Sequence, residues 1–161
     1  MPKDNAVRAV FDCMIYLQAT ANEKSPAAAL LRLVEQEEIV LYLSREVIAE
    51  VKDVLSRPKL RASLPNINDV TVEALFKRLE RIAVLVRQVP PVFEYARDPK
   101  DEKYINLAAV ADAQYIVSRD TDLLALMTGH SEDCKEFRQR FRPLKVVDPI
   151  SFLNLIEPAK K

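Results

Sequence analysis

The chain has 161 residues, of which 49% are apolar and 30% charged, and its 24 Lys and Arg balance 24 Asp and Glu. This composition is typical of a globular protein and excludes intrinsic disorder, a collagen-like fibre and a strongly basic nucleic-acid coat. The apolar runs fall far short of the roughly 18 to 20 residues that cross a bilayer, and residues 1–8 are not followed by the apolar region of a signal peptide. We therefore expect a single domain over 1–161, located in the cytoplasm.

Scarce residue types exclude several kinds of site. Gly129 is the only glycine, so a glycine-rich phosphate-binding loop cannot be built. His130 is the only histidine, which excludes zinc sites made of several histidines, and its polar surroundings predict a surface loop. Cys13 and Cys134 are too few and too far apart for a disulfide framework or a paired-cysteine metal motif, so we expect two free thiols.

In the first half of the chain, short apolar runs rich in β-branched residues alternate with stretches of helical periodicity. The runs predict strands over 7–11 and 39–43. Ser25 and Ser44 each stand directly before a helical pattern and are expected to cap it. The helices predicted in this half run from 26 to about 36, from 45 to a point before Pro58, and from 69 or 71 to about 82, with a loop over 57–68.

The second half continues this alternation. Strands are predicted over 84–89, 115–118 and 144–147, and helices from Pro99, over 122–127 and over 149–156. Asp98 is the expected cap of the helix that starts at Pro99. The stretch between 128 and 143 is predicted to be a loop followed by a basic segment. Strands separated by helices predict an α/β fold, a three-layer sandwich in which helices flank a central, mostly parallel sheet.

Two aspartates stand close behind predicted strands. Asp12 directly follows the strand 7–11, and Asp120 follows the strand 115–118 by two residues. Because ligands bind at the carboxyl ends of parallel strands, both are candidates for one site at that edge of the sheet. The alternative is that each aspartate only caps the helix that follows it. Asp122 lies in the first turn of a predicted helix, where the helix dipole alone favours an acid.

Two further acids lie where a helix is expected to carry an apolar residue. Glu50 borders the buried stripe of its helix, about 40° from Val54. Asp101 precedes Tyr104 by three residues, which places it on the apolar face of its own helix. An unpaired carboxylate is costly in either position, so both are site candidates. The alternatives are an ion pair of Glu50 with a Lys or Arg, and a first-turn role for Asp101 below the Asp98 cap.

Four carboxylates at one edge of a sheet would repel one another and raise their own pKa values unless a cation lay among them. Mg²⁺ and Mn²⁺ prefer oxygen ligands, and a carboxylate set without His or Cys suits them better than zinc. With phosphate oxygens completing the coordination, one or two such ions activate a water and stabilise the leaving oxygen of an in-line displacement. The acids therefore predict hydrolysis of a phosphodiester bond.

The order of these acids and their surroundings resembles a known family. After the aspartate that ends the first strand come the segments SREVIAEVKDVL, DPKDEKYINLAAVADA and SRDTDLLAL. This order is similar to the PIN domain, and in particular to the VapC-like toxins of toxin-antitoxin systems, over about 7–156. The resemblance implies a ribonuclease with a central parallel sheet, Mg²⁺ or Mn²⁺ as cofactor, RNA as substrate, and a small antitoxin and a second copy of the chain as partners.

The resemblance also assigns roles residue by residue. It implies four catalytic, metal-binding acids, which are Asp12, Glu50, Asp101 and Asp120. It implies Asp122 as an accessory metal ligand. It further implies that the Ser118 hydroxyl forms a hydrogen bond with a metal-binding carboxylate.

The chain departs from the family pattern in two places. Cys13 and Met14 stand where a small polar pair usually follows the first aspartate, which removes a polar support from the site. Arg119 stands in place of a glycine and puts a cation beside the acids.

The basic candidates for RNA contact are Arg119, Lys135, Arg138 and Arg142, for which the alternative is a solvated surface. The alternative to an enzyme is a module of the same fold that binds RNA or a protein without cutting it, and the complete acid set favours the enzyme.

Overall fold

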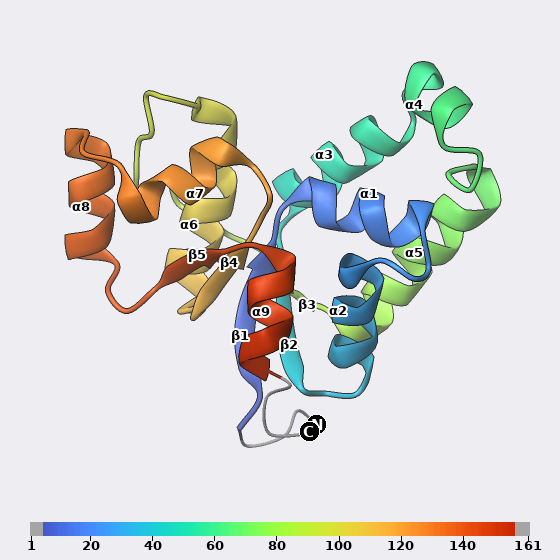
Figure 1. Ribbon diagram of the computed structural model, residues 1–161, viewed down its shortest axis with the longest axis horizontal. Helices are drawn as coiled ribbons and strands as arrows, with labels where there is room; N and C mark the ends of the chain where they lie inside the picture. Colours follow the sequence, from blue (N-terminus) through green and yellow to red (C-terminus); the bar gives the residue numbers. More distant parts are fainter. Residues whose placement is uncertain (1–4, 157–161) are drawn as a thin grey trace.

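A computed structural model describes residues 5–156 and shows a sheet of five parallel strands (Figure 1). The strands are β1 Val7–Phe11, β2 Ile39–Leu43, β3 Val84–Leu85, β4 Tyr115–Val117 and β5 Lys145–Val147. Their spatial order is β3-β2-β1-β4-β5, so the chain starts in the centre, builds one half of the sheet and then returns to build the other. The order reverses between β1 and β4, and ligands of such sheets bind beyond the carboxyl ends of the strands at this point.

The register of β1 brings the carboxyl ends of three strands level. Val10 pairs with Tyr42 of β2, and Phe11 pairs with Val117 of β4. Phe11 has no exposed surface, as expected for the central strand of a parallel sheet with both faces covered. The polar residues that directly follow these strands at the shared edge are Asp12, Ser44 and Ser118.

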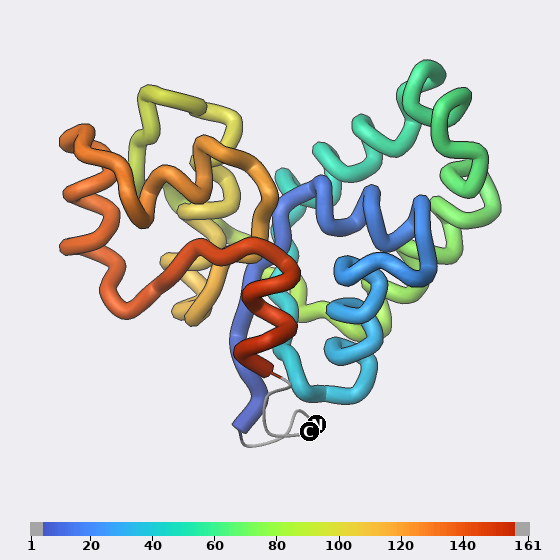
Figure 2. The backbone as a smooth tube through the Cα atoms, viewed as in Figure 1, coloured from blue at the N-terminus to red at the C-terminus, as the bar shows by residue number. Residues whose placement is uncertain are grey.

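The helices form two groups on either side of the strands (Figure 2). One group contains α1 Cys13–Ala21, α2 Pro26–Glu35, α3 Arg45–Leu55, α4 Pro58–Ser63 and α5 Asp69–Ile82. The other contains the short 3₁₀ helix η1 Pro99–Asp101, α6 Glu102–Ala111, α7 Thr121–Thr128 and α8 Glu132–Arg140. The last helix, α9 Pro149–Ile156, packs against α2.

The predicted α/β fold, with helices flanking a parallel sheet, is confirmed. Two of the predicted helix caps are also confirmed, since Ser25 accepts a hydrogen bond from the Ala28 N–H and Ser44 accepts one from the Val47 N–H. Asp98 caps η1, as expected, by accepting a hydrogen bond from the backbone N–H of Lys100.

Three predictions for individual segments are wrong. The predicted loop 57–68 contains α4, which is too short to show a periodic pattern and buries none of its residues. The stretch between 128 and 143 contains α8, whose inward side consists of Cys134 and Phe137 among charged neighbours, so its apolar stripe is too sparse to recognise. The predicted strand 84–89 is reduced to β3, because this edge strand pairs with β2 alone and two prolines follow it at 90 and 91.

Within 5–156, no helix combines the length and the apolar character that crossing a bilayer requires. Cys13 and Cys134 are both free thiols, as predicted, with Cys13 half-buried and Cys134 buried. His130 is exposed in the loop between α7 and α8, also as predicted.

The packing of α9 on the sheet yields a test of the fold. Phe152 is fully buried and its ring lies against Tyr115 of β4, with ring centroids 5.2 Å apart. We expect Phe152→Ala to lower the free energy of unfolding by about 3 to 5 kcal/mol, because it removes a buried ring and leaves a cavity. Leu155→Ala, at a 54% exposed position of the same helix, should change it by less than about 0.5 kcal/mol. Urea denaturation measures both, and equal losses would contradict this packing.

Candidate metal centre

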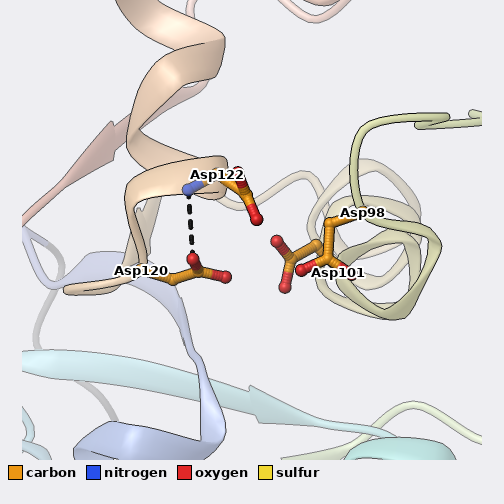
Figure 3. A group of neighbouring side chains, drawn as sticks. All are labelled: Asp98, Asp101, Asp120 and Asp122. Atoms are coloured by element: carbon orange, nitrogen blue, oxygen red, sulfur yellow. Dashed lines mark hydrogen bonds between the residues drawn. The ribbon is translucent and has the colours of Figure 1, made fainter.

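Four aspartates from two segments face one another at the carboxyl edge of the sheet (Figure 3). Asp98 and Asp101 belong to the segment that leads into α6, and Asp120 and Asp122 belong to the start of α7. One carboxylate oxygen of each lies within 4.8 Å of the corresponding oxygens of the other three. We call these four residues the aspartate group.

The first turn of α7 positions one half of the aspartate group. Asp120 is the N-cap residue, and its Oδ1 accepts a hydrogen bond from the Asp122 N–H at 3.0 Å. Figure 3 shows the other oxygen of Asp120 turned toward the carboxylates of the opposite segment. Tyr95 supports the same turn, because its hydroxyl donates to the carbonyl oxygen of Asp122 at 2.6 Å. Capping and site membership are thus compatible roles for Asp120.

In the other half of the aspartate group, Asp98 ends the irregular segment 86–98 and Asp101 ends η1, which follows it. The side-chain oxygen of Asn106 on α6 accepts hydrogen bonds from the backbone N–H groups of Val92 and Phe93, at 3.0 and 2.9 Å. Asn106 and Phe93 are both buried. The segment that delivers Asp98 is therefore held in place by α6, the same helix that Asp101 precedes.

Asp101 is the most deeply buried member of the aspartate group. Its side chain is 5% exposed, and its Oδ2 has no hydrogen-bond partner among the described residues. Burial raises the pKa of Asp101 well above its usual range, and the neighbouring Asp120 raises it further. A buried carboxylate oxygen without a donor is costly, and a cation is the partner that would satisfy it.

Asp12 lies beside the group and is linked to it through Ser118. The Ser118 hydroxyl donates to Asp12 Oδ2 and accepts a hydrogen bond from the backbone N–H of Asp120 at 2.8 Å. Asp12 Oδ1 caps α1, accepting hydrogen bonds from the N–H groups of Met14 and Ile15. Burial raises the pKa of Asp12 to about 6, although the Ser118 hydrogen bond acts in the opposite direction. The serine therefore couples the position of Asp12, which follows β1, to that of Asp120, which follows β4.

Glu50 on α3 is engaged by two side chains of α6. Lys103 Nζ donates to Glu50 Oε2 at 2.9 Å, and the Tyr104 hydroxyl donates to Glu50 Oε1. Despite partial burial, these hydrogen bonds and the Lys103 charge hold the pKa of Glu50 below its ordinary value. The ion pair that the sequence left open as the alternative for Glu50 is therefore present.

The structure brings together three of the predicted site residues, Asp101, Asp120 and Asp122, and two hydrogen bonds of Ser118 link Asp12 to the backbone of Asp120. Glu50 is not a member of the aspartate group. Asp98 is a member that the sequence analysis assigned only to capping. The sequence feature that could have identified Asp98 is its position three residues before Asp101, since residues at this spacing share one side of a helical turn.

The basic residues differ in how far they are engaged by the protein. Arg97 Nε donates to Asp122 Oδ1 at 2.6 Å, so a cation already lies at the rim of the aspartate group. Arg138 donates to the backbone carbonyls of Leu126 and Gly129, which ties its guanidinium to the end of α7. The predicted RNA contacts with exposed side chains are Arg119, Lys135 and Arg142.

The donor set fits a hard divalent cation. Every ligand offered by the aspartate group is a carboxylate oxygen, which Mg²⁺ and Mn²⁺ favour and which Zn²⁺ rarely uses without His or Cys. The group combines negative charge with the unsatisfied Oδ2 of Asp101, and a cation would offset both. The aspartate group can therefore hold a metal ion.

A family model described as PIN domain matches residues 8–122, from β1 to the first turn of α7. The chain belongs to the PIN domain family. The matched segment contains the whole aspartate group as well as Asp12 and Glu50. This PIN domain is also similar to the uncharacterized protein MJ1680 of Methanocaldococcus jannaschii, with 27% identity over 151 residues that cover 94% of this chain and 92% of the relative.

The raised pKa of Asp12 predicts how pH changes the stability of the metal-free protein. The folded state holds the Asp12 proton more tightly than the unfolded state does. The free energy of unfolding therefore falls as pH rises from about 4 through about 6, the range in which the unfolded and then the folded state lose this proton. Asp12→Asn keeps a helix-capping side chain but cannot ionise. We expect its free energy of unfolding, relative to wild type, to increase by roughly 2 to 3 kcal/mol between pH 4 and pH 7. Urea denaturation in EDTA measures this, and a constant difference would contradict the raised pKa.

Proposed function

We propose that this PIN domain is a Mg²⁺- or Mn²⁺-dependent endoribonuclease that hydrolyses phosphodiester bonds in RNA. The observation that carries the proposal is the aspartate group, in which Asp101 lies close to three other acids and its buried Oδ2 has no hydrogen-bond partner among the described residues. Such an arrangement is unfavourable for stability alone, since charge repulsion and desolvation both oppose it. A bound divalent cation would offset both costs, so the arrangement suits a cation-binding site.

Each acid has its own place in the proposed reaction. The four members of the aspartate group, Asp98, Asp101, Asp120 and Asp122, would hold the cation. When bound, the ion lowers the pKa of a coordinated water and stabilises charge on the leaving oxygen. Asp12 is 3% exposed and already accepts three hydrogen bonds, so it acts through Ser118 to fix the Asp120 backbone. Glu50 is a positioning residue, because it orients Lys103 and Tyr104 beside the aspartate group.

RNA would approach the aspartate group along its exposed basic rim. Arg97 pairs with Asp122, and Arg119 directly precedes Asp120 with an exposed side chain. Arginine side chains at this rim would contact RNA phosphates through their positive charge. Lys135 is exposed on α8, whereas Arg142 precedes the amino end of β5 and lines a pocket with Asp112 and Ala113, at the opposite edge of the sheet from the aspartate group. Binding through phosphates makes affinity fall as salt rises.

A cleavage assay tests the activity. With Mn²⁺ and a labelled single-stranded RNA, Asp101→Asn and Asp120→Asn should each lower the cleavage rate about 100-fold to 1000-fold, because charge stabilisation at the reacting phosphate is lost. EDTA should abolish cleavage by the wild type. Asp53→Asn is the matched control, since Asp53 is an exposed acid of α3 paired with Arg57.

Each result of the assay discriminates between the two functions. Cleavage that persists in EDTA, or that is equal in wild type and Asp101→Asn, would refute the metal-dependent enzyme. Binding of RNA without any cleavage would instead support the non-catalytic module of the same fold. An inactive Asp53→Asn variant would show that loss of activity reflects loss of folding rather than loss of the site.

The toxin role is a further part of the proposal. The order of the acids and their sequence context resemble VapC-like toxins, which implies a small antitoxin protein as partner. A gene for a small protein directly beside the gene of this PIN domain, whose product binds it and inhibits cleavage, would support the role. An isolated gene would count against it and leave the ribonuclease proposal intact.

A further inference from the structure

Lys103 is a largely buried cation that is dedicated to Glu50. Their side chains are only 17% and 23% exposed, and Nζ lies 2.9 Å from Oε2. The ammonium also donates to the carbonyl oxygen of Lys100 at 2.6 Å, so the backbone just before α6 fixes its position. The other oxygen of Glu50 accepts a hydrogen bond from Tyr104, which is 2% exposed. Both oxygens of Glu50 are thus occupied by groups from α6.

Tyr104 links this pair to the residue that follows Asp12. Lys103 comes two residues after Asp101, and the Tyr104 hydroxyl accepts a hydrogen bond from the backbone N–H of Cys13 at 3.1 Å, next to Asp12. Burial raises the pKa of the Cys13 thiol to about 12, and the charges of Glu50 and Asp12 add to this effect. Glu50 and Asp12 therefore both lie close enough to Cys13 to act on its thiol.

The balance of charge differs at the two ends of this edge. Among the described residues, the buried Oδ2 of Asp101 lacks a partner, whereas Glu50 has an ammonium and a hydroxyl. Binding a second divalent ion at Glu50 would require the carboxylate to leave Lys103, and the ion would then approach a largely buried ammonium of like charge. Binding at the aspartate group meets no such opposition from Lys103.

We propose that Lys103 takes the place of a second divalent cation at the Glu50 end of the site, so that this PIN domain binds one metal ion per chain. The inference rests on the proposed metal site and makes Lys103 a positioning residue, which neutralises Glu50 and keeps it from the ion. Removing Lys103 frees Glu50 as a ligand and creates a second cation site.

Counting bound Mn²⁺ tests this directly. Equilibrium dialysis with metal analysis should give one Mn²⁺ per wild-type chain and two per Lys103→Met chain, since methionine keeps the length of the side chain and loses its charge. Electron paramagnetic resonance should show a spin-coupled Mn²⁺ pair in the variant alone. The double variant Lys103→Met with Glu50→Gln should return to one ion, and Lys100→Met, an exposed neighbour, should remain at one.

The outcomes separate this inference from the proposed function. Two Mn²⁺ ions in the wild type, or one in Lys103→Met, would overturn the role of Lys103 and leave the metal-dependent nuclease intact. No bound Mn²⁺ in the wild type would overturn the metal site itself. If Lys103→Met is poorly folded without metal, thermal denaturation with and without Mn²⁺ decides: a larger Mn²⁺-induced rise in Tm than in wild type supports the inference, and an equal rise contradicts it.

Discussion

Repulsion between carboxylates that are close together and partly withdrawn from water is the interaction on which this structure depends. The parallel sheet cannot avoid it, because the level ends of β1 and β4 deliver Asp12 and Asp120 to the same edge. The segment before α6 then adds Asp98 and Asp101. Much of the surrounding hydrogen bonding serves to hold these acids in spite of their charge.

The protein compensates for the acids in different ways at different positions. Asp12 receives hydrogen bonds from the start of α1 and from Ser118, so neutral donors stabilise it. Asp122 and Glu50 receive cations, from Arg97 and Lys103. For Asp101 Oδ2 the described residues supply neither. This unevenness gives the aspartate group a defined place for an ion, whereas an evenly neutralised cluster would have no need of one.

Local patterns in the sequence were enough to predict much of the fold and part of the candidate site. Apolar runs located β1, β2 and β4, and the conflict between an acid and an apolar helix face identified Asp101. Glu50 could not be decided from the sequence, because its partner Lys103 is brought to it by packing of α3 against α6. Asp98 was missed because its capping role explains an aspartate at that position completely. Contacts between elements distant in the chain decide such cases, and periodicity does not report them.

The hydrogen bonds of Asn106 to Val92 and Phe93 tie the lifetime of the site to a local folding equilibrium. Residues 86–98 contain no helix or strand, so the order of the segment depends on this amide, on the buried rings of Phe93 and Tyr95, and on hydrogen bonds from its backbone to side chains of α6 and α8. An opening that breaks these contacts would displace Asp98 from the other carboxylates while the sheet stays intact. Slow hydrogen exchange at the amides of Val92 and Phe93 would then report an assembled centre, independently of the global stability of the protein.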